Sequence, residues 1–291
     1  MWIPAEDTKA LSPLLLGIRS SYPSLTRTER RIADVVLDPE RPQALVRWSV
    51  SECAAEIGVS EASIVRFCQK VGLRGYQELK LTLAQMMGSG AEPPSDGVEL
   101  PVPQRWYQST AARHQRSLAA TLGVLDHDAL EAAAQLLVAS RLIHCYGIGA
   151  SGYTAMDAAY QFIRVGLSAQ ALTDAHVQAM AAANVTAADV VLGISVSGST
   201  KDILTSLAIA KDAGARIIAL TNHRRSPITH LADVLLLTSC ETGPLEGGSL
   251  STKSGQLLVL DMLLTAVMVQ LKDAAYESLQ RTARAVLDKL V

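Results

Sequence analysis

The chain has 291 residues, of which 49% are hydrophobic and 19% charged, a composition typical of a packed globular protein and not of a disordered one. At this length the chain is long enough for two domains. The formal net charge of −2 at pH 7 excludes a global basic field for nucleic acid, but it leaves room for a local basic face.

Segments that would direct the chain to a membrane or to secretion are not evident. The first seven residues lack a basic region followed by an apolar one, and the apolar stretch Leu257–Leu271 is shorter than a membrane span. The four cysteines, at positions 53, 68, 145 and 240, show no metal-ligand or redox spacing, so we expect buried thiols in a reducing compartment. We therefore expect a cytoplasmic protein that binds no membrane, metal or cofactor.

The first part of the chain carries helical patterns only. Residues Leu25–Leu37 alternate apolar and charged positions at helical spacing, and Thr26 with Glu29 forms a capping-box pattern at its start. A further helix is expected over Tyr76–Met87. This part of the chain is predicted to be an all-α domain.

Two short helices in this part are joined by a tight turn. A second capping-box pattern opens a helix over Val50–Ile57, Gly58 ends it, and Ser60 is placed to cap a helix over Glu61–Val71. A tight glycine-containing turn between two short helices is typical of a helix-turn-helix motif. The spacing therefore predicts such a motif over residues 50–71.

The second helix of the motif carries a polar stripe on one face. Its members are three and four residues apart, as recognition helices require, although an ordinary solvated face would show the same spacing. The guanidinium group of Arg66 has two parallel N–H donors, which match the O6 and N7 acceptors that guanine presents in the major groove. From this stripe we predict the following DNA-contacting residues: Ser60, Ser63, Arg66, Gln69 and Lys70.

Composition changes sharply after Met87. The segment from Gly88 to Pro103 is rich in Gly, Pro and Ser, which predicts an interdomain linker over residues 88–104. This divides the chain into a helix-turn-helix domain over residues 1–87, the linker, and a second domain over residues 105–291.

The second domain alternates short apolar strands with helices. Strands are expected over residues 142–146, 169–172, 189–194, 216–220 and 233–238. Strands separated by helices form right-handed units with a parallel sheet covered on both faces. The prediction is an α/β domain with a doubly wound five-stranded parallel sheet, whose ligands bind at the carboxyl ends of the strands.

The turn after the third strand, Ile194–Thr200, concentrates hydroxyl groups where a helix begins. It contains Ser195, Ser197, Ser199 and Thr200, and Gly198 allows backbone to approach a ligand closely. Free N–H groups and the helix dipole make such a turn suitable for a phosphate or carboxylate. A connecting turn with a simple helix cap would also be rich in serine.

The turn after the first strand contains three glycines. Gly147, Gly149 and Gly152 match the spacing of a dinucleotide fingerprint, and Asp174 at the end of the second strand could hold a ribose. That interpretation leaves the serine-rich turn without a role. We favour two turns that converge on one small anion, with Ser151 supplied by the first of them.

Taken together, these segments resemble the RpiR family of bacterial transcription regulators. The resemblance rests on residues 59–68 and 75–80 in the first domain and on Gly147–Ser151, Ile194–Thr200 and Ala219–Asn222 in the second, which is similar to a sugar-isomerase (SIS) domain. It implies a head that binds a double-stranded DNA operator and a body that senses a phosphosugar effector.

The resemblance also implies roles for individual residues. Ser63, Arg66 and Lys70 would face DNA, and Lys253 would make a further ligand contact. Ser199 stands where many SIS turns carry Glu or Arg, so the sugar itself is not identified. The residues expected to form the phosphosugar site are Gly149, Ser151, Ser195, Ser197, Gly198, Thr200 and Lys253.

Two other functions remain open at this stage. A phosphosugar isomerase would need a general base, for which the sequence offers His144, His176, His223, His230, Glu241 and Glu246. An adaptor with a protein-binding helical head is a third interpretation. Because no catalytic pair has a diagnostic spacing and the DNA-reading head would be unexplained, we expect no enzyme activity.

A single head buries too little surface to select a genomic site. We therefore expect a homo-oligomer, a dimer or tetramer, assembled through the SIS domain. An apolar stripe along Tyr276–Leu290 is a candidate for part of the interface.

Overall fold

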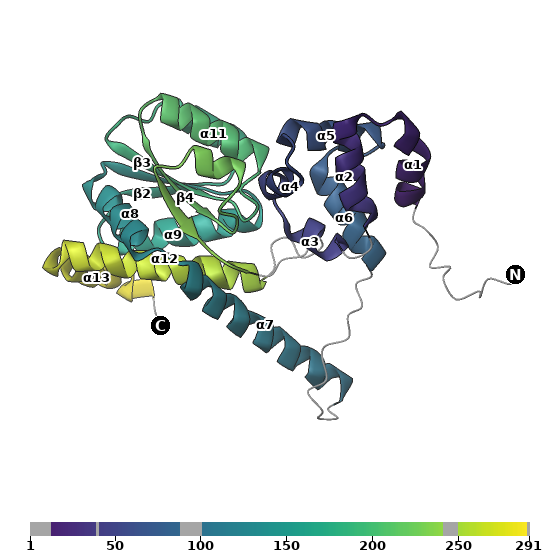
Figure 1. Ribbon diagram of the computed structural model, residues 1–291. Coiled ribbons are helices and arrows are strands. Elements are labelled where there is room, and N and C mark those ends of the chain that lie inside the picture. The colour runs from purple at the N-terminus through teal and green to yellow at the C-terminus, as the bar shows by residue number, and fades with distance from the viewer. Residues whose placement is uncertain (1–12, 39–40, 88–100, 241–249, 290–291) are drawn as a thin grey trace, which may run out of the picture. The chain divides into compact units, whose positions relative to one another are not determined.

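The structure, a computed structural model, describes residues 13–38, 41–87, 101–240 and 250–289 (Figure 1). The described residues up to 87 form a helical unit and those from 101 onward form an α/β unit. Of the predicted linker, residues 88–100 lie outside the described part, and residues 102–104 already belong to a helix. The predicted domain boundaries therefore stay a prediction.

The helical unit follows the local patterns closely. Both predicted capping boxes are present: the Thr26 and Ser49 side chains each accept from the N–H of a glutamate three residues on, and that glutamate bonds back to the cap. Two helices, α1 and α3, were not expected from the sequence. The elements are α1 Pro13–Ser21, η1 Tyr22–Ser24, α2 Arg27–Leu37, α3 Pro42–Arg47, α4 Val50–Ile57, α5 Glu61–Lys70 and α6 Tyr76–Met87.

The helix-turn-helix consists of α4 and α5. Gly58 ends α4 in the left-handed conformation, and the Ser60 side chain caps α5 by accepting from the Ser63 N–H. The inner side of α5 is formed by Ile64, Phe67 and Cys68, which are completely buried in the core of this unit. The other face of α5 is left to solvent.

The α/β unit has the predicted strand and helix order. Its five strands form one parallel sheet with the order β2-β1-β3-β4-β5. The elements are α7 Val102–Val124, α8 His127–Ala139, β1 Leu142–Tyr146, α9 Ala150–Arg164, β2 Ala169–Leu172, α10 Ala175–Ala182, β3 Asp189–Ile194, α11 Lys201–Asp212, β4 Arg216–Thr221, η2 Pro227–His230, β5 Val234–Leu237, α12 Leu250–Leu271, α13 Asp273–Arg284 and η4 Leu287–Lys289.

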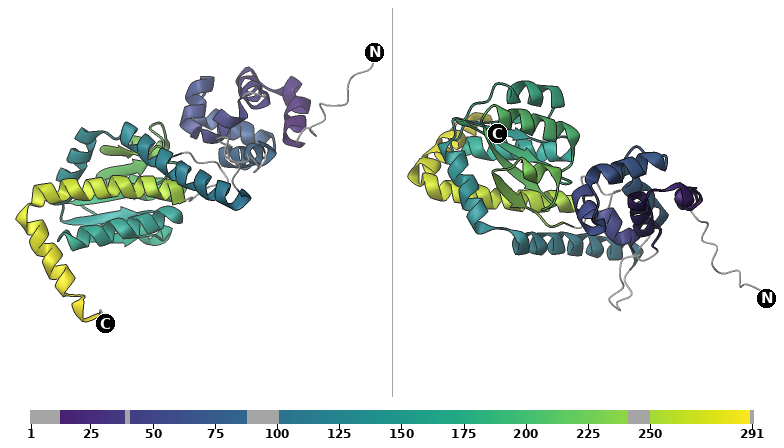
Figure 2. Two further views of the ribbon diagram at one scale, coloured as in Figure 1. Left: turned by 90° about the horizontal axis from the view of Figure 1, so that it is seen from below. Right: turned by 45° about the horizontal axis from the view of Figure 1, so that its top comes forward.

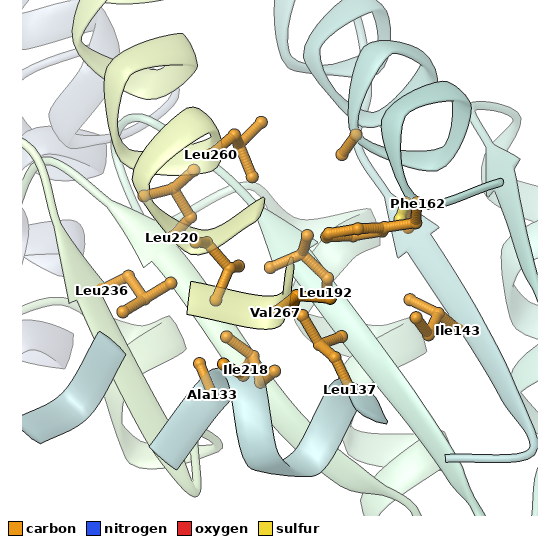
Figure 3. Packing of buried hydrophobic residues seen from close by; sticks show 14 of the residues in the cluster. Ala133, Leu137, Ile143, Phe162, Leu192, Ile218, Leu220, Leu236, Leu260 and Val267 are labelled. Atoms are coloured by element: carbon orange, nitrogen blue, oxygen red, sulfur yellow. The ribbon is translucent and has the colours of Figure 1, made fainter. Parts of the chain in front are cut away.

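Helices cover both faces of the sheet. On one face α8, α9 and α12 lie side by side, and on the other α10 and α11 pack against the opposite sides of the same strands (Figures 1 and 2). Figure 3 shows the first of these layers, where Phe162, Leu260 and Val267 meet Leu192 and Leu220 of the sheet. The core is built almost entirely from aliphatic residues, as the low aromatic content requires.

Helix α12 is longer than the sequence pattern indicated. Among the described residues it is the one helix long and apolar enough to cross a membrane by length and composition. Its Val259, Leu263 and Val267 are completely buried against the sheet and its neighbouring helices. The fold therefore uses this helix as part of the core.

The predicted stripe along Tyr276–Leu290 does not form one continuous face. Helix α13 ends at Arg284, so Val286 and Leu287 leave its helical register. Its inner side is formed by Ala275 and Ser278. Tyr276 is exposed on the outside.

One basic residue of the head lies in its interior. Lys80 is 8% exposed, and its ammonium donates to the Trp48 carbonyl at 2.8 Å. Burial lowers the pKa of Lys80 to about 8, an effect that the Glu52 carboxylate partly offsets. Lys80 therefore does not contribute to a basic surface.

The position of Lys80 leads to a prediction about the pH dependence of head stability. Its pKa is lower in the folded chain than in the unfolded chain, so between about pH 8 and 10.5 the unfolded chain holds more protons. The free energy of unfolding should therefore rise with pH across this window, by on the order of 3 kcal/mol relative to a Lys80→Met variant. Urea unfolding of the full chain at a series of pH values measures this free energy. Trp2 and Trp106 are replaced by phenylalanine in both proteins, so that the fluorescence of Trp48 reports unfolding of the head.

The comparison between the two proteins isolates Lys80, because the other titrating groups of the head are common to both. An unchanged difference in unfolding free energy across the window would mean that Lys80 is hydrated in solution.

Candidate functional site

The strand order changes direction beside β1. From β1 the chain goes outward to β2 and then returns to add β3 on the other side, where Tyr146 pairs with Gly193. The turns that follow β1 and β3 therefore leave neighbouring strands at the same edge of the sheet. In open parallel sheets this topological switch point is where ligands bind.

The turn after β3 is held in place by the strand beside it. Ser195 N–H donates to the Leu220 carbonyl at 3.0 Å, and the Gly198 N–H closes a tight turn onto the Ser195 carbonyl at 3.1 Å. The Val196 carbonyl accepts from both the Asn222 N–H and the Thr221 hydroxyl. The backbone carbonyls of the turn thus bond to the segment after β4, which fixes its shape.

Gly198 is a position at which only glycine fits. Its φ of +61° lies in the left-handed region, and a Cβ atom there would come within 2.1 Å of Ser226 Oγ. The Gly198 carbonyl accepts from the Ile228 N–H at 2.9 Å. The segment containing Ser226 and Ile228 therefore packs directly against the turn.

The hydroxyl groups of this turn lie close together. Ser195 Oγ and Thr200 Oγ1 are 3.0 Å apart, so one hydrogen is shared between them and the other is free to donate. Ser197 Oγ accepts from the Ser199 N–H at 3.2 Å. This leaves the Ser197 hydroxyl hydrogen available, so the turn can offer O–H donors to an anion.

The helices that begin at the switch point differ from their neighbours in how their N-termini are capped. An aspartate side chain caps α8 (Asp126) and α10 (Asp174), each by accepting from two backbone N–H groups. Among the described residues, no side chain caps α9 or α11, whose N-cap residues are Gly149 and Thr200. The first N–H groups of these two helices are therefore available to an anion.

The capping role of Asp174 bears on the dinucleotide interpretation. Both of its backbone bonds, to the Val177 and His176 N–H groups, are 3.0 Å long, and they hold the pKa of this carboxyl below its usual value. The acidic residue that could have held a ribose is thus used to begin α10.

The glycine turn over Gly147–Gly152 predicts that the next helix covers Tyr153–Val165, but α9 already begins at Ala150. Ser151 therefore lies in the first turn of α9, where it is 8% exposed. Gly149 has φ +59° and ψ −127°, a conformation open to glycine. On the other side, Gln178 of α10 donates to the Gly147 carbonyl at 3.1 Å, which anchors the turn.

Helix α12 approaches the same turn. The Lys253 ammonium lies 4.9 Å from the centre of the Tyr153 ring, and the Thr154 hydroxyl donates to Gln256 Oε1 at 2.9 Å. These contacts place the beginning of α12 beside the first turn of α9. Lys253 is therefore the predicted site residue that comes from the most distant part of the sequence.

The candidate general bases are dispersed. His144 lies within β1, 5% exposed, and burial lowers its pKa, so it is a neutral core histidine that pairs with Gln170. His176 lies at the start of α10 and His230 in η2, whereas His223 follows β4. Glu241 and Glu246 lie outside the described residues.

The predicted polar stripe of the head lies on the open face of α5. Ser60 and Ser63 hydroxyls are 2.8 Å apart, and Arg66 donates to Ser63 at 3.4 Å, so these three side chains form a chain along the helix. Gln69 is exposed. This face combines hydroxyl, amide and guanidinium groups on one side of a helix.

Lys70 has a partner that the sequence did not indicate. Its ammonium lies 2.8 Å from Glu29 Oε2, and the same carboxylate accepts from the Thr26 N–H at 2.7 Å to complete the capping box of α2. The bond to Lys70 is the main cause that lowers the pKa of Glu29. Lys70 is thus half-exposed and ion-paired, and not a free cation.

Other residues that shape the anion site were also not expected. Gln178 anchors the first turn, and Asn222 clamps Cys240 by accepting from its N–H at 2.7 Å and donating to its carbonyl at 2.9 Å. Asn222 belongs to Ala219–Asn222, one of the segments on which the family resemblance rests, so the sequence did indicate that it could be important. Gln178 could not be found in this way, because a glutamine within a helix belongs to no local pattern.

Comparison with known protein families gives two matches along the chain. Residues 13–90 match a helix-turn-helix domain of the rpiR family. Residues 136–266 match the SIS domain. Together these segments include both candidate sites described above.

Similar proteins align with this chain over nearly their whole length. An uncharacterised helix-turn-helix transcriptional regulator from Haemophilus influenzae is 34% identical over 283 residues, covering 96% of this chain and 98% of the relative. The transcriptional regulator HexR of Pseudomonas aeruginosa is 32% identical over 263 residues, with 88% and 90% covered.

Among solved structures, the NanR protein of Vibrio vulnificus complexed with ManNAc-6P is similar over both domains. It superposes with a TM-score of 0.85 at 27% identity, covering 96% of this chain and all of the other.

Proposed function

Because this chain belongs to the RpiR family of helix-turn-helix transcriptional regulators, we propose that a phosphorylated sugar or sugar acid controls its binding to a DNA operator. The observation that carries the proposal is the pair of uncapped helix N-termini, α9 and α11, that begin at the switch point, together with the paired hydroxyls of Ser195 and Thr200. The chain is a regulator with a SIS domain and not an isomerase, as its relatives are named.

The proposed site binds phosphate through neutral donors. Ser151, Ser195, Ser197 and Thr200 offer hydroxyls, and the first N–H groups of both helices add backbone donors and the positive ends of two dipoles. Gly149 and Gly198 keep side chains away from the anion. NanR, which binds ManNAc-6P, aligns with this chain over its full length, and this supports a ligand of the same chemical class.

Lys253 has a different place in the proposal. Its ammonium is held over the Tyr153 ring beside the first turn of α9, so it adds positive charge at the rim of the site. From there we propose that it contacts the phosphate or a carboxylate of a sugar acid. The described residues do not identify which sugar is bound.

In the head, the open face of α5 is proposed to enter the major groove. Arg66 reads a guanine edge, Ser60, Ser63 and Gln69 contact backbone or bases, and Lys70 contacts phosphate. We further propose that the protein acts in the cytoplasm as a homo-oligomer assembled through the SIS domain, because two heads are needed to read paired half-sites.

The phosphate site leads to a prediction about Ser197. A hydrogen bond to a charged acceptor contributes about 1.5–3 kcal/mol, so Ser197→Ala should weaken binding of the phosphorylated effector by roughly ten- to a hundred-fold. The effector is identified first by a thermal-shift screen of phosphosugars, since a ligand that binds only the folded state raises its apparent stability. Calorimetric titration of the wild type and the variant then gives the loss.

Two controls accompany this titration. Ser140→Ala removes a hydroxyl at the end of α8 that bonds only within its own helix, and it should bind the effector like the wild type. The dephosphorylated sugar should bind poorly to all three proteins. Equal affinity for both sugars would mean that the site is not organised around phosphate.

The head leads to a prediction about Arg66 and Lys70. Arg66→Ala should lose roughly 1–3 kcal/mol of affinity for a duplex selected from a random pool by the wild type, and it should blur sequence preference. Lys70→Ala should weaken binding to every duplex and reduce the salt slope by about 1. Shift assays over a range of salt concentrations measure both; unchanged affinity in both folded variants would remove α5 from the interface.

The ion pair of Lys70 allows a sharper test. Glu29→Gln keeps a side chain that can complete the capping box but removes the charge that holds Lys70. An exposed ion pair contributes about 0.2–1 kcal/mol, so freeing Lys70 should tighten binding to all duplexes by up to about five-fold. The Glu29→Gln, Lys70→Ala double variant should show no such gain. If the single variant binds DNA no better than the wild type, Lys70 does not meet phosphate.

A further inference from the structure

A short segment after β5 connects three parts of the α/β unit. It consists of residues 238–240, and its Thr238 and Cys240 are buried. We call residues 238–240 the β5 strap. The strap is hydrogen-bonded to the segment after β4 on one side and to helices α7 and α12 on the other.

On one side the strap is held by Asn222. The side-chain oxygen of Asn222 accepts from the Cys240 N–H at 2.7 Å and from the Thr238 hydroxyl at 3.1 Å. Its side-chain nitrogen donates to the Cys240 carbonyl at 2.9 Å. The backbone N–H of Asn222 donates to the Val196 carbonyl at 3.0 Å, within the hydroxyl turn of the proposed phosphate site. Asn222 therefore connects the turn to the strap.

On the other side the strap contacts α7 and α12. The Thr121 hydroxyl of α7 is completely buried, accepts from the Ser239 N–H at 3.1 Å and lies 3.9 Å from the Cys240 thiol. The same thiol donates to the Thr252 carbonyl of α12 at 3.9 Å. Both helices are thus bonded to the strap.

Helix α12 provides a second connection from the proposed site to α7. Lys253, a proposed ligand contact, is followed by Ser254, whose hydroxyl lies 2.9 Å from His114 Nδ1 of α7. The next residue is Gly255, at which a Cβ atom would come within 2.5 Å of Cys240 Sγ. Because α12 packs this closely on the strap, the two cannot slide past one another.

These contacts favour movement of the connected parts together. A buried donor or acceptor that loses its partner is strongly unfavourable, so a displacement of the hydroxyl turn or of Lys253 is passed to α7 and not absorbed by broken bonds. The first half of α7 can follow, because Trp106 and Tyr107 are exposed there and this half extends away from the sheet (Figure 1). From α7 the chain leads back to the head.

We propose that α7 moves when the phosphate site is occupied and thereby changes the operator affinity of the head. Asn222 and Thr121 are the positioning residues in this step. The inference rests on the proposed function, since it names how binding at the site is passed on. The Asn222 side chain and the Thr121 hydroxyl both bond to the strap, so neither has to contact the anion.

Thr121→Val tests this proposal, because valine has the shape of threonine but offers no acceptor to the Ser239 N–H. Shift assays give the operator affinity with and without the phosphosugar that the thermal-shift screen selects, and their ratio is the coupling factor. We expect a factor in the 5–150-fold range that is typical of coupled sites to fall to about two-fold or less in the variant. Calorimetry without DNA should show that the variant still binds this phosphosugar.

Two further variants serve as controls for this assay. Thr121→Ser keeps the hydroxyl and should keep the coupling factor of the wild type. Thr265→Val makes the same change in α12, where the hydroxyl bonds to the Asp261 carbonyl of its own helix, and it should also leave the coupling factor unchanged. A coupling factor that Thr121→Ser fails to restore would contradict the role of the hydroxyl.

Amide hydrogen exchange gives a second measurement that needs no DNA. Inorganic phosphate is compared with sodium chloride of equal ionic strength. In the wild type, phosphate should slow exchange in the hydroxyl turn Ile194–Thr200 and in α7, whereas in Thr121→Val it should slow exchange in the turn alone. Protection of the turn without a change in α7 of the wild type, or an equal change in α7 of both proteins, would overturn the proposal.

The outcomes separate this inference from the proposed function. A wild type whose operator affinity does not respond to the phosphosugar, or whose hydroxyl turn is not protected by phosphate, would reject both. A wild type that responds, together with a folded Thr121→Val variant that responds equally, would reject the role of α7 alone.

Discussion

The proposed phosphate site at the edge of the sheet depends on the backbone N–H groups at the beginnings of α9 and α11, which have no intrahelical partner. A helix N-terminus leaves its first N–H groups without intrahelical partners, and most proteins cap them with a side chain. This chain does so at α8 and α10, with Asp126 and Asp174. Among the residues that the structure describes, no side chain does so for α9 and α11, the two helices that begin at the switch point. Their donors remain in place for a ligand, and the nearby hydroxyls of Ser195 and Thr200 are already held 3.0 Å apart.

Much of the fold could be predicted from the sequence, because its signals are local. Buried strands such as Asp189–Ile194 are short apolar runs, and the two capping boxes are four-residue patterns, so both were placed correctly. Helices α1 and α3 were missed; α3 has six residues and begins without a side-chain cap, so it lacks the start signal that α2 and α4 show. The start of α9 was placed too late, because Gly152 suggested a turn although it lies in the helix and packs against Thr173.

The site was predictable only in part, because its details depend on contacts between distant residues. The hydroxyl turn was visible, since a serine-rich segment after a buried strand is a local pattern. Lys70 was predicted to face DNA, and its ion pair with Glu29, 41 residues earlier in the chain, has no local pattern that could have indicated it. Lys80 is enclosed by the core of the head, a placement that no local pattern of charge indicates. The presence of a lysine or arginine in the sequence does not show whether its side chain is exposed, buried or ion-paired. These properties decide whether its charge is available to DNA, and they depend on distant residues.

Helix α9 shows how several constraints act on one segment. Its N-terminus must stay uncapped to accept an anion, and its inner face must be small, with Ala155, Ala158 and Ala159 packed close to the sheet. Its outer face carries large side chains that are half exposed or more, beginning with Tyr153, two residues after Ser151. The Lys253 ammonium lies 4.9 Å from the centre of the Tyr153 ring, so the beginning of α12 contacts the same first turn of α9 that carries Ser151. One turn of helix thus has to keep its N–H groups open, pack its inner side against the sheet and hold the beginning of α12.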